Sequence, residues 1–275
     1  MTSLTKRKLG RTDLMVTELG FGAMDTPQTA EGEETLALAV DLGINYVDTA
    51  RIYQNSEFLI GQVIRTKGEA NFFLASKTID RTLDGSQYDV DRSLRFLGVD
   101  KIDLYQVDDV LPEDWDQVMA PGGSLEGLQT AKFRGLIDHI GISSHSLEIV
   151  EKAITCGEFD TVMLEYSAFY RETEQLIALA NEMNVGVIAM RPVGGSGRMS
   201  SLRTKILSSQ GEYPITPALL LRYTLSNPGV SVAIVGARYP SRVKENVATL
   251  SSYEPLTPEE KRQCETEADL FYQPV

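Results

Sequence analysis

The chain has 275 residues and a mass of 30.4 kDa, and 42% of its residues are hydrophobic and 24% charged. This composition is typical of a globular protein with a substantial core and excludes an intrinsically disordered chain. The formal net charge of -13 excludes a general nucleic-acid-binding function, because contacts with phosphates need a basic surface. A local basic pocket for a phosphorylated cofactor is compatible with that charge.

Cysteine usage and the N-terminus bear on where the protein works. Cys156 and Cys264 lie in helix-like contexts, with no CxxC motif and no histidine at metal-ligand spacing. We therefore expect free thiols in a reducing cytoplasm and no metal site. No apolar run reaches about 18 residues, and the opening MTSLTKRKLG lacks the apolar segment of a signal peptide. The sequence predicts a cytoplasmic protein without membrane contacts.

A predicted β-hairpin over residues 6–19 opens the chain, with its turn at 11–13, and such a hairpin could plug one end of a barrel. Apolar strands then alternate with segments of helical spacing. The strands are expected at 17–24, 45–50, 71–78, 101–108, 139–144, 161–167, 186–192 and 231–237. The helices are expected at 33–43, 56–65, 88–98, 124–135, 147–157, 172–184, 216–227 and 241–251, with a capped C-terminal helix at 257–270 on the outside.

Eight strand-helix units are the number that closes an α/β (β/α)8 TIM barrel. A doubly wound open sheet is the alternative, but it normally carries a GxGxxG turn after its first strand, and GFGAMDTP does not fit that motif. We therefore expect one barrel domain over residues 1–275. Two long connections, 109–123 and 193–215, are expected to overhang the carboxyl end of the barrel, where TIM-barrel active sites lie.

Residues at the carboxyl ends of the expected strands are the candidate site. They are Asp48, Lys77, Asp108, Ser143, Ser144, Tyr166, Arg191 and residues 236–238, with Tyr53 on the polar loop after Asp48. An Asp can pair with a Lys whose ammonium lowers the pKa of a nearby phenol. Tyr53 could then exchange a proton with a carbonyl or alcohol near neutral pH. A structural salt bridge beside a bystander Tyr53 is the alternative.

Six ordered motifs resemble the aldo-keto reductase family over nearly the whole chain: KLGRTDLMVTELGFGAM, NYVDTARIYQNSEFLIG, FFLASK, DLYQV, IGISSHS and VGARYPSRVKENVA. The DTAxxY and GARxxxRxxEN segments are the most specific. The resemblance implies a barrel that binds NADPH across its rim and transfers hydride to or from a carbonyl carbon, without a metal or a Rossmann motif. Such barrels are often self-sufficient as monomers.

On this resemblance Asp48, Tyr53 and Lys77 match the family's catalytic residues, with Tyr53 as the general acid-base. Ser143 and Ser144 match the Ser-Asn pair that holds the nicotinamide carboxamide, although Ser144 is shorter than the usual Asn.

Further cofactor contacts are implied along the last strands. Met163 stands where the family often has a Gln, and Met190 where an aromatic ring often stacks on nicotinamide. The pyrophosphate path is implied at Arg191, Pro192 and Gly194, and the adenosine end at Gly236, Arg238, Arg242, Glu245 and Asn246. Independently of the family, two arginines at a strand-to-helix junction favour a phosphate site, with an ordinary solvated helix start as the alternative.

The fourth strand departs from the family pattern. DLYQVDDV places Asp108 where the family's fourth catalytic residue, His, is expected, and the family's steroid double-bond reductases carry Glu there. A protonated Asp108 would donate a hydrogen bond to a substrate oxygen, and an ionised one could accept from a sugar or polyol hydroxyl. Loss of the His without a new role is the third option. Structural roles are favoured for His139 and His145, although His145 could approach the nicotinamide side.

These observations predict an NADP(H)-dependent oxidoreductase acting on an aldehyde, ketone, sugar or polyol. Two alternatives stay open. One is an NADPH-binding redox sensor with weak turnover, suggested by Asp108, Ser144 and Met163. The other is an enzyme that uses transient oxidation for elimination or epimerisation. Trp115 and the acidic residues of 109–123 suggest a polar, sugar-like ligand against an aromatic platform.

Overall fold

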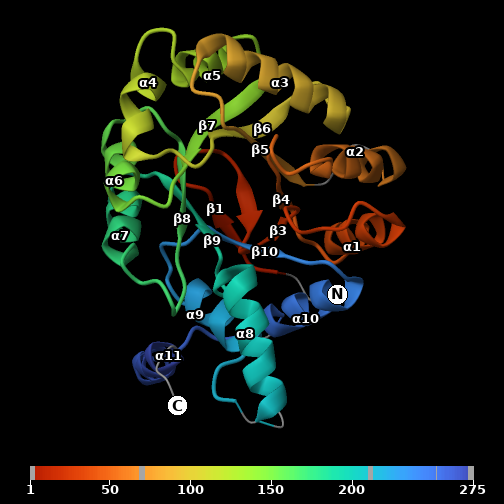
Figure 1. Cartoon of the computed structure of the whole chain (residues 1–275), viewed down its shortest axis with the longest axis vertical. Coiled ribbons are helices and arrows are strands. Elements are labelled where there is room, and N and C mark those ends of the chain that lie inside the picture. Colours follow the sequence, from red (N-terminus) through yellow and green to blue (C-terminus); the bar gives the residue numbers. More distant parts are fainter. Residues whose placement is uncertain (1–3, 68–71, 210–212, 252, 272–275) are drawn as a thin grey trace.

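The computed structural model describes residues 4–67, 72–209, 213–251 and 253–271. Eight parallel strands close into a barrel in the order β10, β3, β4, β5, β6, β7, β8 and β9. Helices surround this barrel (Figure 1), so the predicted (β/α)8 TIM barrel is confirmed. The barrel strands are β3 (Leu19–Gly22), β4 (Tyr46–Asp48), β5 (Phe73–Thr78), β6 (Ile102–Val107), β7 (Ile137–Ser143), β8 (Thr161–Glu165), β9 (Gly186–Met190) and β10 (Val232–Gly236).

The helices that alternate with these strands are α1 (Ala30–Asp41), α2 (Ser56–Lys67), α3 (Leu83–Leu97), α5 (Ser124–Phe133), α6 (Leu147–Thr155), α7 (Glu174–Glu182), α9 (Pro217–Leu225) and α10 (Pro240–Leu250). α1 and α3 begin earlier than the apolar spacing indicates, because Thr29 and Thr82 cap them with side-chain oxygens. None of the helices within the described ranges is long and apolar enough to cross a membrane.

Strand residues alternate between two apolar clusters. Tyr46 and Leu104 belong to the cluster inside the barrel, whereas their neighbours Val47 and Tyr105 belong to the cluster between barrel and helices. Because side chains of a strand point alternately to its two faces, both faces are buried, and the strands read as nearly continuous apolar runs.

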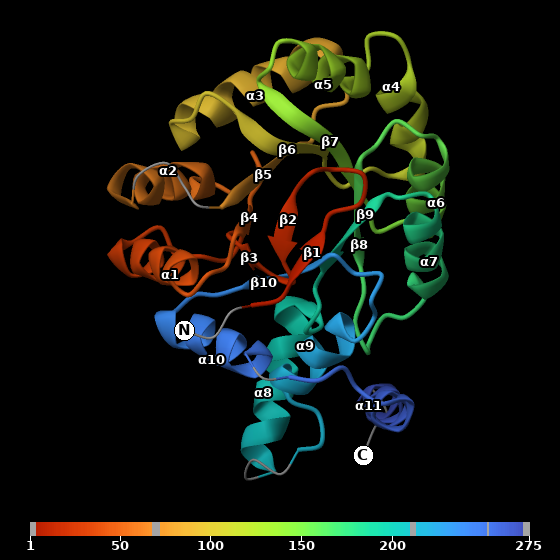
Figure 2. The same ribbon diagram turned by 180° about the vertical axis from the view of Figure 1, so that it is seen from behind.

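The N-terminal hairpin closes one end of the barrel (Figure 2). β1 (Lys6–Lys8) pairs with β2 (Met15–Thr17), and Leu9, Leu14 and Val16 pack within the inner cluster. The hairpin turn approaches β9 so closely that a Cβ at Gly10 would lie 2.1 Å from the Gly186 nitrogen. The predicted plug is therefore present, and the opposite, carboxyl end of the barrel is left for a site.

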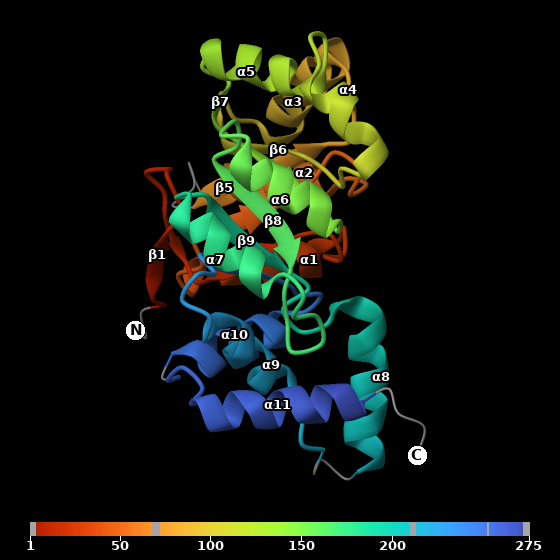
Figure 3. The ribbon, with the colours of Figure 1, turned by 90° about the vertical axis from the view of Figure 1, so that its left-hand side faces the viewer.

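The two long connections contain helices that the sequence did not predict. The first forms the 3-10 turn η1 (Pro112–Asp114) and α4 (Trp115–Met119), and the second forms α8 (Gly195–Ser208). α8 begins at Gly195, which has a positive φ like its N-cap Gly194, and its Met199, Leu202 and Ile206 recur at helical spacing against the outer cluster. Figure 3 shows α4 and α8 toward the side opposite β1.

The C-terminal helix α11 (Pro258–Leu270) packs on the outside, as expected. Its N-terminus carries the predicted capping box of Thr257 and Glu260, and Cys264, in the middle of the helix, is buried. Lys261 pairs with Glu174 of α7, which joins the tail to the barrel helices.

Candidate active site

A buried ion pair lies at the carboxyl end of the barrel. Asp48 is the last residue of β4 and Lys77 the next-to-last of β5. The Lys77 Nζ lies 2.6 Å from Asp48 Oδ1 and donates to the Thr49 carbonyl oxygen at 2.8 Å. The Lys77 side chain is fully buried, so this ammonium has exchanged water for two protein oxygens.

Tyr53 stands beside this pair on the loop between β4 and α2. Its ring centroid lies 5.0 Å from the Lys77 Nζ. The loop is tied down at both ends, because the Arg51 N–H donates to the Lys77 carbonyl at 3.0 Å and the Ser56 N–H to the Tyr53 carbonyl at 2.9 Å. The strand end and the loop therefore hold phenol and ammonium as neighbours.

The electrostatics of this cluster differ from the simple expectation for Tyr53. Burial raises the pKa of the Tyr53 phenol, and Lys77 opposes this increase without overcoming it. Burial likewise raises the pKa of Asp48 to about 6, against the attraction of Lys77. Burial alone would lower the pKa of Lys77, but Asp48 and the other negative neighbours raise it. At neutral pH the phenol keeps its proton and the Lys77–Asp48 pair is ionised.

Asp108 follows β6 and faces the same group. Its Oδ1 accepts a hydrogen bond from the Ser143 hydroxyl at 2.6 Å, and the Asp109 N–H donates to Ser143 Oγ at 2.9 Å. The carboxyl is nearly buried, and its negative charge contributes to the raised pKa of Asp48. The structure thus brings Asp48, Tyr53, Lys77, Asp108 and Ser143 together.

The Ser143–Ser144 pair is engaged within the protein. Ser143 donates its hydrogen to Asp108, and Ser144 donates to the Val110 carbonyl at 2.6 Å. Both hydroxyls therefore offer a carboxamide acceptor lone pairs only. Met163 is buried next to Ser143 in the strand register, and half-buried Met190 packs on the inner cluster. This end of the site therefore offers apolar side chains and few hydrogen-bond donors for an amide.

Glu165 is a site residue that the sequence analysis missed. It ends β8 and is almost fully buried, and its Oε2 lies 3.1 Å from the Arg191 Nη1 and 3.5 Å from the His145 Nδ1. The strand-end pattern instead favoured the adjacent Tyr166, which faces away and donates its hydroxyl to Glu174 of α7 at 3.1 Å. A shift of one residue at the strand end decides which side chain faces the barrel mouth.

The segment after β9 turns sharply. Arg191 has φ of 54°, and Gly194 and Gly195 have φ of 93° and 75°. Pro192 is buried, and its carbonyl accepts from the Thr224 hydroxyl at 3.1 Å. These turns end at the N-terminus of α8, which is a favourable end for an anion.

Exposed cationic groups lie at the start of α10. Arg238 is 60% exposed and its Nη2 lies 3.7 Å from Asp25 Oδ1, while Arg242 pairs with Glu245 at 2.5 Å. Gly236 at the end of β10 is exposed, and a Cβ there would contact only the Gly22 carbonyl oxygen. Asn246 is half-buried on the same helix.

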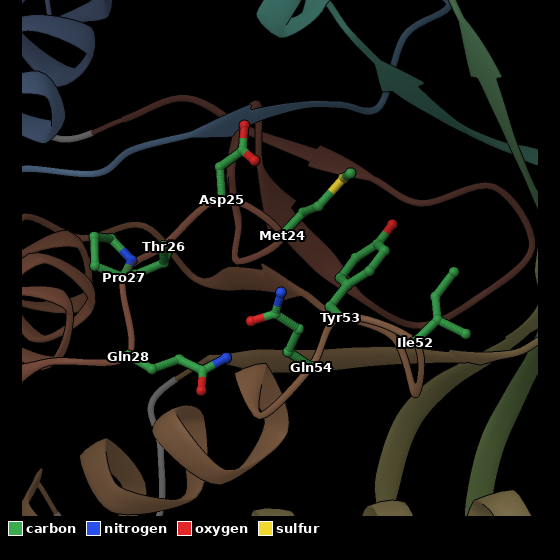
Figure 4. A pocket seen from close by; sticks show the side chains of 8 residues that line it. All are labelled: Met24, Asp25, Thr26, Pro27, Gln28, Ile52, Tyr53 and Gln54. Atoms are coloured by element: carbon green, nitrogen blue, oxygen red, sulfur yellow. The ribbon is translucent and has the colours of Figure 1, made fainter.

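An open cavity of about 440 Å³ lies beside Tyr53. Its walls are Met24, Asp25, Thr26, Pro27, Gln28, Ile52, Tyr53 and Gln54 (Figure 4). Asp25 belongs to this wall and also pairs with Arg238, so the wall of the cavity and the start of α10 are in contact through one carboxylate. Trp115 is not among the residues of this wall: its ring packs 6.4 Å from that of Phe159, before β8, and the expected aromatic platform stays a prediction.

The enclosed ion pair and the phenol lie at the carboxyl end of a parallel barrel, which is where enzymes with a TIM barrel have their active sites. The sequence model of the Aldo/keto reductase family matches residues 18–214, and the chain belongs to that family. Its members are oxidoreductases that generally use NADP(H).

Similar proteins extend over almost the whole chain. An uncharacterized oxidoreductase of Bacillus subtilis, YqkF, is 28% identical, with 98% of each chain covered. L-galactose dehydrogenase of Arabidopsis thaliana is 27% identical over 98% of this chain and 95% of that protein. Among solved structures, the holo form of the aldo-keto reductase AKR11C1 from Bacillus halodurans superposes with a TM-score of 0.82 at 27% identity, covering 96% of each chain.

Replacing Asp48 by Asn tests the electrostatics of the pair. The folded-state pKa of Asp48, about 6, lies above its ordinary value of 3.8. Its contribution to stability is therefore complete below that ordinary value and is lost as the pH rises through about 6. Melting temperatures of wild type and Asp48→Asn measured across this range should show wild type losing stability relative to the variant as the pH rises.

The exposed pair of Asp41 and Lys67 supplies the matched control, because Asp41→Asn makes the same change of charge at the surface. A wild-type protein that gains stability relative to Asp48→Asn over this range would contradict the raised pKa.

Proposed function

We propose that this protein is an NADP(H)-dependent oxidoreductase that acts on an aldehyde, ketone, sugar or polyol, with Tyr53 as its general acid-base. The observation that carries this proposal is the Tyr53 phenol at the wall of an open cleft, next to the buried Lys77–Asp48 pair. When bound, the cofactor supplies or accepts the hydride.

The protein's own residues would then manage the proton. Burial keeps Tyr53 protonated at neutral pH, so in the reductive direction the phenol donates its proton to the substrate oxygen. The Lys77 ammonium stabilises the phenolate that remains, and Asp48 holds the ammonium in place. In the oxidative direction the phenolate takes the proton back. General acid-base catalysis of this kind contributes roughly 10²- to 10⁴-fold to a rate.

The residues on the rim fit a dinucleotide phosphate unevenly. Exposed Arg238 and Arg242 would hold the 2′-phosphate, Glu245 and Asn246 the adenine, and the turn from Arg191 to Gly194 the pyrophosphate. The weaker end is the carboxamide, since Ser143 and Ser144 have committed their hydrogens.

Asp108 favours a hydroxyl-rich substrate. With Oδ1 occupied by Ser143, the carboxyl is oriented toward the Asp48 and Lys77 cluster, where an ionised group would accept a hydrogen bond from a substrate hydroxyl. The similarity to an L-galactose dehydrogenase supports a sugar or polyol. The redox-sensor alternative draws on the same Asp108 together with the weak carboxamide end.

Tyr53→Phe tests whether the phenol is the proton donor. Removing the hydroxyl takes away the proton donor but leaves the ring and the rim, so turnover should be abolished while NADPH binding, followed by fluorescence titration, stays near the wild-type value. Full activity of Tyr53→Phe would overturn the mechanism. A wild type that does not bind NADPH would overturn the cofactor assignment.

Asp108→His tests whether the carboxyl favours a hydroxyl-rich substrate. Loss of a charged acceptor should lower the kcat/KM for sugar or polyol oxidation by about 10- to 100-fold and improve the reduction of simple aldehydes. Asp109→His is the matched control, because Asp109 is exposed and changes the same charge one residue away. Tight NADPH binding by wild type, with no turnover of any aldehyde, ketone or sugar in the panel, would favour the redox sensor instead.

A further inference from the structure

The structure assigns Arg51 a positioning role: one guanidinium fixes the Tyr53 loop against the strand that carries Lys77. This inference rests on the proposed function, since it takes Tyr53 and Lys77 as the proton-transferring pair. Arg51 lies two residues before Tyr53, in the loop between β4 and α2.

Arg51 is shared by two carboxylates on two different helices. Its Nη1 pairs with Glu57 Oε2 on α2, and its Nε lies 3.7 Å from Asp89 Oδ1 on α3. The guanidinium also stands 5.0 Å above the Phe96 ring of α3. Only 13% of the Arg51 side chain and 2% of that of Glu57 is exposed. A charge pair this enclosed is held by its partners and not by solvent.

Both carboxylates also hold the residues on either side of Lys77. The Ser76 hydroxyl donates to Glu57 Oε1 at 2.6 Å, and the Thr78 hydroxyl donates to Asp89 Oδ2 at 2.6 Å. Lys77 points into the barrel, whereas Ser76 and Thr78 point outward toward the helices, because side chains alternate along β5. The hydrogen bonds to Glu57 and Asp89 therefore hold β5 at the residues immediately before and after Lys77.

The Arg51 backbone completes the connection. Its N–H donates to the Lys77 carbonyl at 3.0 Å, so loop and strand are joined at Lys77 itself. Tyr53 lies two residues after Arg51, and Arg51 is held by two carboxylates and by one backbone hydrogen bond. The distance between phenol and ammonium depends on these contacts of Arg51.

A second, half-buried arginine provides a control at the other end of the barrel. Arg7 donates to Glu18 Oε2 at 2.9 Å, with 20% of the Arg7 side chain and 1% of that of Glu18 exposed. It stabilises the hairpin plug and makes no contact with the Tyr53 loop. Arg7→Met should therefore reproduce the loss of a buried ion pair without moving the phenol.

The experiment compares Arg51→Met and Arg51→Lys with Arg7→Met and Arg7→Lys. Each variant is assayed for melting temperature, NADPH affinity, and steady-state kinetics with 4-nitrobenzaldehyde and with xylose. In parallel, 3-fluorotyrosine-labelled protein is titrated by 19F NMR, with the Tyr53 resonance identified by its loss in Tyr53→Phe. That titration reports on the phenol without needing turnover. Arg51→Lys keeps the charge but not the planar fork, and covers the case in which Arg51→Met fails to fold.

A positioning role predicts that Arg51→Met lowers kcat by about 10- to 100-fold with unchanged NADPH affinity. The midpoint of the Tyr53 titration should shift away from the wild-type value, because a released loop changes both the burial of the phenol and its distance from Lys77. Arg51→Lys should fall between wild type and Arg51→Met, and both Arg7 variants should lose only melting temperature.

Arg51 variants that lose melting temperature but keep the wild-type kcat and Tyr53 titration would overturn the inference, and the proposed function would still stand if Tyr53→Phe is inactive. If wild type turns over neither probe, the 19F titration alone decides for or against the positioning role.

Discussion

The site depends on one constraint: the Lys77 ammonium, buried at the mouth of the barrel, must stay paired with the Asp48 carboxylate. Lys77 and Asp48 lie on adjacent strands, and removing either partner would leave an uncompensated charge in a nearly dry environment, which costs several kcal/mol. The surrounding strands cannot relax to admit water, because their other face is packed against the helices. The position of the pair therefore determines where the Tyr53 phenol must lie for the Lys77 charge to act on it.

The rest of the chain divides labour around this pair. The hairpin plug fills the opposite end with Leu9, Leu14 and Val16, so polar groups gather at the carboxyl end. β5 contributes to both faces of the barrel sheet: Lys77 points inward, whereas Ser76 and Thr78 point outward and donate hydrogen bonds to helix carboxylates. Asp108 adds a second carboxyl to the mouth of the barrel, and it accepts a hydrogen bond from Ser143 of β7.

The fold could be predicted because the information is local. Alternation of apolar strands with amphipathic helices, and the hairpin turn at 11–13, depend on sequence spacing alone. Asp48, Lys77 and Asp108 follow from the strand-end rule, but the same rule selected Tyr166 where Glu165 faces the mouth. α8 was missed because the glycines that begin it resemble a loop. The net pKa shift of Tyr53 and the two carboxylates around Arg51 arise from tertiary packing, which no spacing encodes.

In the proposed reaction, hydride passes between NADPH and a substrate carbon while Tyr53 transfers the proton. The most direct measurement is isotope transfer: wild type and Tyr53→Phe are incubated with NADPH deuterated at the transferable C4 position of nicotinamide and with 4-nitrobenzaldehyde or xylose, and the products are analysed by mass spectrometry. The account predicts one deuterium at the former carbonyl carbon with wild type and almost no product with Tyr53→Phe. NADPH binding without deuterium in any product, or equal labelling by both proteins, would contradict it.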